Sequence, residues 1–234
     1  MPPAGPVPPG GDLGTAAAGE LVGGDRASAG DVVGAVAQLV RYPLRSAAGE
    51  ALERARCTVA GLAGDREHVL VDGAGRALRG RDAPALASLR AHLAGERLVV
   101  ADADGHELDA AGLAAATGVA GAATAPAREH GAAPGSAAVA PVHVVSQGAQ
   151  SGPDAEGCDP DPRANVVLAL DPATGPGAER GWVGARLLAG DAVLVVTHTP
   201  RRCLGVYADV LVEGDVAVGD TVRLLAADGP AGGA

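Results

Sequence analysis

The second half of the chain consists of short apolar segments separated by glycine-containing turns, and this spacing limits the folds open to it. Five such segments follow one another closely, namely VAPVHVVS, ANVVLAL, ARLLAGDAVLVVTH, LGVYADVLVEG and DTVRLL. Gly-Asp pairs beginning at positions 190, 214 and 219 mark turns between or within them. Several short strands at close spacing are typical of a closed or partly closed β-barrel. The sequence therefore predicts a mainly β fold with a few short helices.

The first half of the chain predicts further short strands. EHVLVDGAGRALRGR contains a strand, a glycine-rich turn and a return strand, and RLVVADADGHEL repeats the pattern. Between them, DAPALASLRAHL predicts a helix that Asp82 caps, with Leu86, Leu89 and Leu93 on one face. A second, shorter helix is expected to begin at Asp109.

Composition divides the chain into five segments. Pro, Gly and Ala dominate both ends, which lack a hydrophobic period and are expected to be disordered. An Ala- and Gly-rich stretch separates the two strand-rich parts. The predicted segments are a disordered tail (1–30), a β-barrel-like N-terminal module (31–115), a linker (116–137), a second β-barrel domain (138–228) and a disordered tail (229–234).

Charge and residue usage exclude several classes of function. A net charge of -10 with 1% aromatic residues argues against a nucleic-acid partner. All 18 cationic residues are arginine, so a Schiff-base lysine for pyridoxal phosphate and a Walker lysine are both impossible. The 3 cysteines cannot supply a four-cysteine iron–sulfur cluster or zinc site. Any iron–sulfur electron donor must therefore be another protein.

The sequence also predicts where the protein is located. No apolar run approaches the roughly 20 residues of a membrane span. The first residues, MPPAGPVPPGGDLG, lack both the basic start and the apolar stretch of a secretory signal. We therefore expect a cytoplasmic protein with no membrane partner.

Cys203 is the cysteine whose setting suggests chemistry. It follows Arg201 and Arg202 in VTHTPRRCLGVYADV, and neighbouring cations favour the thiolate over the thiol. A thiolate is a soft ligand for a thiophilic metal, although an inert thiol at a strand end remains the alternative. Cys57, between alternating apolar residues, is expected to be a core strand residue, and Cys158 an exposed bystander in an acidic loop.

Six motifs occur in the order and rough spacing seen in MOSC-domain proteins. They are RYPLRS (41–46), GLAGDREHVLVD (61–72), RANVVL (163–168), GARLLAGDAVLVV, PRRC (200–203) and VGDTVRLL. The first two resemble the N-terminal β-barrel module that precedes the MOSC domain. The chain is thus similar to the amidoxime reducing component and its bacterial relatives, which reduce N-hydroxylated compounds. The resemblance implies a molybdenum–molybdopterin cofactor.

The resemblance also implies which residues form the site. Cys203 matches the cysteine that ligates the metal, so it is the predicted catalytic and metal-binding residue. The pterin phosphate requires forked cations and hydrogen-bond donors. The predicted cofactor-binding residues are Arg45, where relatives usually have lysine, Ser46 beside it, Arg66 of the Asp-Arg pair, Arg163 and Asn165 of the Arg-x-Asn motif, and Ser146, which would replace a serine of the segment that is shortened here at 147–160.

Three functions follow as hypotheses. In the first, reduced molybdenum takes oxygen from a small N-hydroxylated substrate, and two electrons and two protons then remove the oxo group as water. Because DGAGRAL lacks a dinucleotide-binding fingerprint, the electrons would come from an external ferredoxin- or flavin-type reductase. The alternatives are a molybdopterin carrier or persulfide sulfur carrier that uses Cys203, and a protein that binds a small anion without catalysis.

Overall fold

The structure is a computed structural model that describes residues 30–131, 140–151, 163–201 and 204–225. The two predicted tails lie outside these residues, except for Gly30 at the edge of the first tail. Cys158 and Cys203 also lie outside them. Among the described residues, no helix is both long enough and apolar enough to span a membrane.

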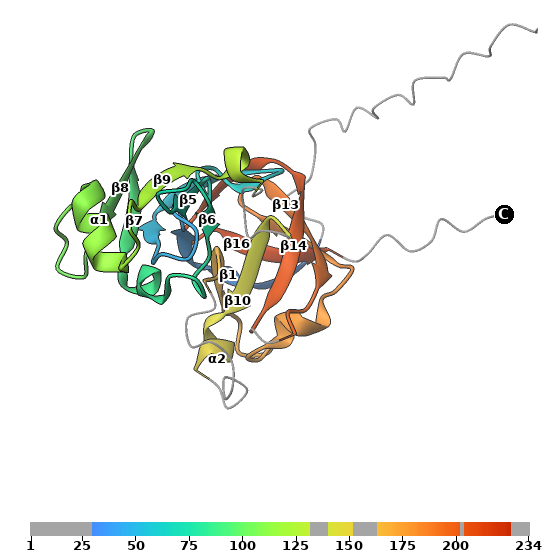
Figure 1. Cartoon of the computed structure of the whole chain (residues 1–234). Coiled ribbons are helices and arrows are strands. Elements are labelled where there is room, and N and C mark those ends of the chain that lie inside the picture. The colour runs from blue at the N-terminus through green and yellow to red at the C-terminus, as the bar shows by residue number, and fades with distance from the viewer. Residues whose placement is uncertain (1–29, 132–139, 152–162, 202–203, 226–234) are drawn as a thin grey trace, which may run out of the picture.

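Seven strands of the described residues close into a barrel, which confirms the predicted mainly β fold (Figure 1). Each strand pairs with the next, and the last pairs with the first. Around the barrel the order is β1 (Asp31–Arg41), β16 (Thr221–Leu225), β12 (Arg186–Ala189), β13 (Ala192–His198), β14 (Val206–Val212), β10 (Val142–Ser146) and β11 (Val166–Leu170).

Strand β1 closes this barrel although it comes from the other end of the chain. It pairs antiparallel with β11 on one side and with β16 on the other. Its register shifts near Val36 and Gly34, and such bulges allow a strand to bend around a barrel. Val36 and Leu39 on its inner face are buried in the main apolar cluster of the barrel. Because these contacts are all distant in sequence, the barrel depends on β1.

The remaining strands lie beside the barrel, and those from the first half of the chain are drawn in blue to green in Figure 1. β2 (Glu50–Leu52) pairs with β1, and β15 (Gly214–Ala217), β3 (Arg54–Thr58) and β4 (Gly61–Leu62) form one sheet. A second sheet contains β6 (Ala77–Leu78), β5 (His68–Val71) and β9 (Ala123–Pro126), and β7 (Arg90–Ala94) with β8 (Arg97–Ala101) forms a hairpin.

The described helices are short. They are α1 (Ala110–Thr117), α2 (Gln147–Gln150) and three 3₁₀ helices, Pro84–Ser88, Ala127–His130 and Ala178–Gly181. The helix expected from Asp109 is confirmed: the Asp109 carboxylate accepts from the Gly112 N–H at 2.8 Å, and Gly118 ends the helix at a φ of 69°.

The helix predicted over 82–93 is wrong. Only Pro84–Ser88 is helical, as a 3₁₀ turn, and Leu89 is already extended. Arg90–Ala94 then pairs with Arg97–Ala101 as a hairpin, which satisfies its backbone hydrogen bonds across the strands. Leu86 and Leu89 are buried in one cluster, so their spacing reflects burial and not a continuous helix.

The segment predicted as a linker (116–137) contains regular secondary structure over the residues that the structure describes. It begins in the last turn of α1 and continues into β9, which pairs with β5 from Val71↔Ala123 to His68↔Pro126. Residues 116–131 are therefore an integral part of the N-terminal sheets. Residues 132–137 lie outside the described part.

Candidate functional site

Backbone strain marks the predicted site. Among the described residues, three that are not glycine have a positive φ: Ser46 at 72°, Arg66 at 53° and Arg163 at 48°. A side chain in this left-handed region costs about 1–2 kcal/mol, and such residues cluster at functional sites. All three belong to the set that the sequence motifs select. They come from two distant parts of the chain, before β5 and before β11.

Arg66 lies at the centre of this site and is largely buried. Its backbone N–H donates to the Tyr42 carbonyl at 2.7 Å, and its guanidinium lies 4.8 Å from the centre of the Tyr42 ring. The guanidinium pairs with the Asp65 carboxylate and donates to Asn165 Oδ1 at 3.4 Å and to the Arg163 carbonyl at 3.1 Å. Arg66 therefore connects the N-terminal sheets to the start of β11.

Asp65 holds this arginine in place. Its Oδ1 accepts from the Tyr42 N–H at 2.8 Å, and its Oδ2 pairs with Arg66. Burial raises the pKa of Asp65, while the charge of Arg66 and the Tyr42 N–H oppose the change. The Tyr42 hydroxyl in turn donates to the Ala164 carbonyl at 3.3 Å, so Tyr42 does more than fill the core.

Asn165 is fully buried and joins three strands. Its Oδ1 accepts from the His143 N–H of β10 at 3.2 Å, and its Nδ2 donates to the Val40 carbonyl of β1 at 3.3 Å. Its backbone N–H donates to the His143 carbonyl at 2.8 Å, and its carbonyl accepts from the Val40 N–H at 2.9 Å. The Asn165 side chain thus holds β11 between β1 and β10.

Arg45 and Ser46 form the neighbouring, more open side of the site. Burial lowers the pKa of Arg45, and the charges of Arg66 and Arg79 lower it further, with Asp65 opposing them. The Gly80 N–H donates to Ser46 Oγ at 3.0 Å and brings the turn that contains Arg79 beside it. Arg66 and Arg79 thus both repel the Arg45 guanidinium, and an anion bound beside Arg45 would offset this repulsion. Arg79 lies in none of the recognised motifs.

Ser146 is not brought to this cluster. Its Oγ caps α2 by accepting from the Ala149 N–H at 3.3 Å, and it also accepts from the Gly177 N–H at 3.1 Å. Its own N–H donates to Glu179 Oε1 at 3.0 Å. In the parallel pair β10–β11, Ser146 lies opposite Leu168, at the far end of β10 from the His143–Asn165 bonds. The hydroxyl therefore serves the local fold.

Cys203 lies outside the described residues, but Leu204, which follows it, is within them. Leu204 is buried in an apolar cluster with Ala149 and Ala164. Ala164 lies between Arg163 and Asn165, so the chain that leaves Cys203 packs against the Arg-x-Asn motif. The Leu204 carbonyl is also within 2.8 Å of His143 Nε2. His143 could not be identified from the sequence, because it is a single histidine in an apolar strand and belongs to none of the motifs.

Cys57 has the core position that the sequence predicts. It lies in β3, is buried in the barrel cluster, and burial raises the pKa of its thiol to about 12. The thiol is therefore protonated at neutral pH and is a poor metal ligand.

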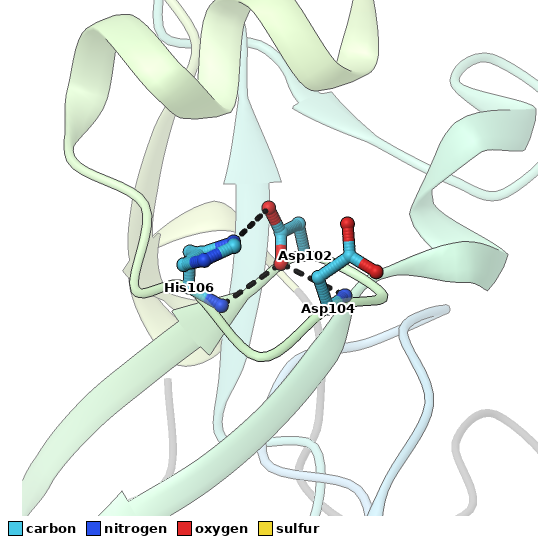
Figure 2. Close-up of side chains that lie close together, drawn as sticks. All are labelled: Asp102, Asp104 and His106. Atoms are coloured by element: carbon cyan, nitrogen blue, oxygen red, sulfur yellow. Dashed lines mark hydrogen bonds and ion pairs between the residues drawn. The ribbon is translucent and has the colours of Figure 1, made fainter.

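A second group of polar residues, Asp102, Asp104 and His106, lies in the turn after β8 (Figure 2). The Asp102 carboxylate accepts from the N–H groups of Asp104 at 3.0 Å and His106 at 2.9 Å, and it lies 3.2 Å from His106 Nδ1. These bonds, with that of the His106 N–H foremost, lower the pKa of Asp102. The group stabilises a turn in the described structure, and nothing else there indicates a metal.

Comparison with known proteins places the chain in a family. No curated protein matches it. It is similar to the crystal structure of the YUAD protein from Bacillus subtilis, with 12% identity and a TM-score of 0.44 over 82% of this chain and 95% of that chain. The family model for the MOSC N-terminal beta barrel domain matches residues 33–140. MOSC domains are associated with molybdenum cofactor-binding proteins. Residues 33–140 therefore match the MOSC N-terminal beta barrel domain, and this match supports a MOSC-domain protein.

Proposed function

We propose that this protein binds a molybdenum–molybdopterin cofactor and reduces small N-hydroxylated compounds with electrons from an external reductase. The observation that supports this most is the strained backbone at Ser46, Arg66 and Arg163, which coincides with the family motifs. Strain of this kind persists only where the surrounding structure holds it, and here it adjoins the cationic cluster of Arg45, Arg66 and Arg79.

The donor set fits the phosphate of a pterin cofactor. Arg45 and Arg79 would supply charge, and the Ser46 hydroxyl would donate beside them. Arg66 has a different role from the one expected, because its guanidinium already contacts Asp65, Asn165 and the Arg163 carbonyl. It would position Arg163 and Asn165 instead of contacting phosphate directly.

Cys203 would hold the metal through its thiolate. The bound cofactor supplies two-electron oxygen-atom transfer at molybdenum. The chain would supply the soft ligand and the cations that keep the pterin in place, and Leu204, the residue after the cysteine, packs beside Ala164 of the Arg-x-Asn motif.

The test is the molybdenum and pterin content per chain after expression in a host that makes the cofactor. We expect near-stoichiometric metal and pterin in the parent protein, loss of metal in Cys203→Ala, and loss of both in Arg45→Ala. Losing a charge-assisted hydrogen bond weakens binding about 10- to 100-fold. Arg76→Ala is the matched control, because Arg76 is exposed and pairs only locally with Asp72.

A parent protein free of both metal and pterin from such a host would contradict the proposal. Metal-free protein with a persulfide on Cys203 by mass spectrometry, and no turnover of hydroxylamines, would instead favour the sulfur-carrier function. Substrate reduction with a supplied ferredoxin- or flavin-type reductase then completes the test in the loaded protein.

A further inference from the structure

The N-terminal sheets contain a cavity of about 300 Å³ that the proposed function does not use. Its walls come from three places: the residues that lead into β5, the end of β9 with the 3₁₀ helix that follows it, and the turn between β7 and β8. The lining residues are Glu67, His68, Glu96, Pro126, Ala127 and Arg128. Four of these six side chains are acidic, basic or imidazole, so the cavity suits a charged occupant.

Hydrogen bonds hold the backbone on two sides of the cavity. The Glu67 carbonyl accepts from the Ala127 N–H at 2.7 Å, and His68 pairs with Pro126 across β5 and β9. Glu67 Oε1 also accepts from the Gly64 N–H at 3.2 Å, which holds one carboxylate at the wall. A site whose walls are already held in place loses little conformational entropy when a ligand binds.

The charged groups of the cavity do not pair with one another in the described structure. Over the residues that it covers, the side chains of Glu96 and Arg128 make no ion pair or hydrogen bond. His68 Nδ1 is buried and likewise has no hydrogen-bond partner there. Buried polar atoms nearly always have a partner, and the broad χ2 torsion of histidine lets the ring turn toward a donor in the cavity. These groups are therefore available to an occupant.

A single metal ion does not match this arrangement. Within the described ranges, ligand atoms of three residues lie within 4.8 Å of one another in the turn after β8, and not at Glu67, His68 and Glu96. The guanidinium of Arg128 would also repel a metal ion. Because the acidic and imidazole groups do not converge on one point, an extended molecule with separate cationic groups fits them better.

We propose that this cavity binds a basic α-amino acid: Glu67 and Glu96 pair with its two cationic groups, and Arg128 pairs with its carboxylate. The charges match one to one, since such a molecule carries two cationic groups and one carboxylate at neutral pH. Charge-assisted hydrogen bonds are the strong ones, and a guanidinium and a carboxylate can pair through two of them. The volume of about 300 Å³ lies at the lower end for small-molecule sites, which suits a single amino acid. The inference goes beyond the proposed function and does not depend on molybdenum.

The test is isothermal titration calorimetry of the full-length protein with L-arginine and with three analogues that each lack one charged group. Agmatine lacks the carboxylate, L-citrulline lacks the side-chain charge, and N-acetyl-L-arginine lacks the α-ammonium. We expect saturable binding of L-arginine with a Kd of about 1 mM or tighter. Each analogue should bind about five-fold more weakly, because it leaves one charged group of the cavity without a partner.

Substitutions in the cavity should remove these preferences one at a time. Arg128→Gln should weaken L-arginine about five-fold and leave agmatine within about two-fold, because agmatine has no carboxylate to lose its partner. Glu96→Gln should also weaken L-arginine about five-fold, and should leave within about two-fold whichever of L-citrulline and N-acetyl-L-arginine lacks the cation that Glu96 binds.

Glu129→Gln is the matched control. Glu129 is exposed beside Arg128 and does not line the cavity, so its loss should change no affinity by more than about two-fold. Glu96 and Arg128 are exposed as well, and all three variants should therefore keep the thermal midpoint of the parent.

No saturable binding of L-arginine would overturn the proposal. Equal affinities for L-arginine and all three analogues would also overturn it, and so would an equal loss in Glu96→Gln and Glu129→Gln, because the lining charges would then not be recognised individually. These titrations do not measure molybdenum, so their failure leaves the proposed function untouched. A protein that binds L-arginine as expected but never contains molybdenum would reject the proposed function alone.

Discussion

At the scale of single residues, the position of Asn165 requires a side chain that both donates and accepts hydrogen bonds. Asn165 is the single asparagine of the chain, and it both accepts from β10 and donates to β1. Aspartate would lose the donor and bring a second carboxylate toward Asp65, while an apolar residue would satisfy neither strand. The family motif and the barrel therefore require the same residue for different reasons.

Asn165→Ala should lower the free energy of unfolding by about 2–4 kcal/mol, because the His143 N–H, the Val40 carbonyl and the Arg66 guanidinium lose a buried partner. Urea unfolding followed by circular dichroism measures this. Ser88→Ala is the control and should cost less than about 0.5 kcal/mol, since its bond to the Ala85 carbonyl is exposed. A smaller loss in Asn165→Ala than in Ser88→Ala would contradict the argument.

Cys57 should make the protein less stable in alkali. Burial raises the pKa of its thiol to about 12 from its ordinary value of 9.0, so above pH 9 the unfolded chain releases a proton that the folded chain keeps. Stability attributable to Cys57 is then fully present below pH 9 and is lost as the pH rises toward 12. Between pH 8 and pH 10 the loss is about 1.4 kcal/mol.

Urea unfolding of the parent and Cys57→Val at pH 8, 9 and 10 tests this difference. Valine is close in volume to cysteine and does not titrate, so the gap between the two proteins should shift by that amount in favour of Cys57→Val. An unchanged gap across these pH values would mean that the folded thiol titrates as it does in the unfolded chain.

The sequence could predict which residues lie together at the candidate site better than it could predict what each residue does there. Arg45, Ser46, Arg66, Arg163 and Asn165 come together as the motifs indicate. However, a serine before a short helical turn has the same pattern whether it caps the helix or binds a ligand. Only the bonds to the Ala149 and Gly177 N–H groups show that Ser146 serves the fold.

At the scale of elements, pairing between strands determined secondary structure that the local spacing of apolar residues could not predict. Leucines at 86, 89 and 93 have helical spacing, yet Leu93 pairs with Leu98 in a hairpin that turns at Gly95, with its φ of 66°. Alternation and turn residues predicted the strands from Val142 onward, because each is short and several of them end at glycine-containing turns. They could not predict that β1 would close the barrel, since its partners β11 and β16 lie more than a hundred residues away.

Gly34 tests how closely β1 must approach β11. It has a φ of 151°, and a Cβ there would lie 2.1 Å from the Ala169 carbonyl oxygen. Gly34→Ala should therefore push the strands apart at the barrel seam and cost more than about 3 kcal/mol. Gly75→Ala is the matched control: its φ is 76°, but nothing lies within 4 Å, so only the backbone strain of about 1–2 kcal/mol remains.

Thermal and urea unfolding of both variants give the comparison. Equal costs for Gly34→Ala and Gly75→Ala would mean that backbone strain alone accounts for the effect and that the seam tolerates a methyl group. A larger cost for Gly34→Ala would show that the β1–β11 contact limits the stability of the barrel.

At the scale of the whole molecule, the N-terminal sheets and the barrel cannot be separated at a single boundary. β1 belongs to the barrel, β2 pairs with β1, and β3 pairs with β15 from the far end of the chain. Buried contacts from Asp65 through Arg66 and Asn165 to the His143 N–H also join these two parts. Because each part completes the other, we expect them to unfold together.

Leu86→Ala tests this cooperativity from a distance. Leu86 is fully buried in the cluster of the N-terminal sheets, whereas Trp182, the single tryptophan, is buried in the barrel cluster. Removing the leucine side chain should cost about 2–5 kcal/mol. If the two parts unfold as one unit, the urea midpoint from Trp182 fluorescence falls as far as the midpoint from circular dichroism. An unchanged Trp182 midpoint beside a two-step dichroism curve would mean that the barrel folds without the sheets, despite β1.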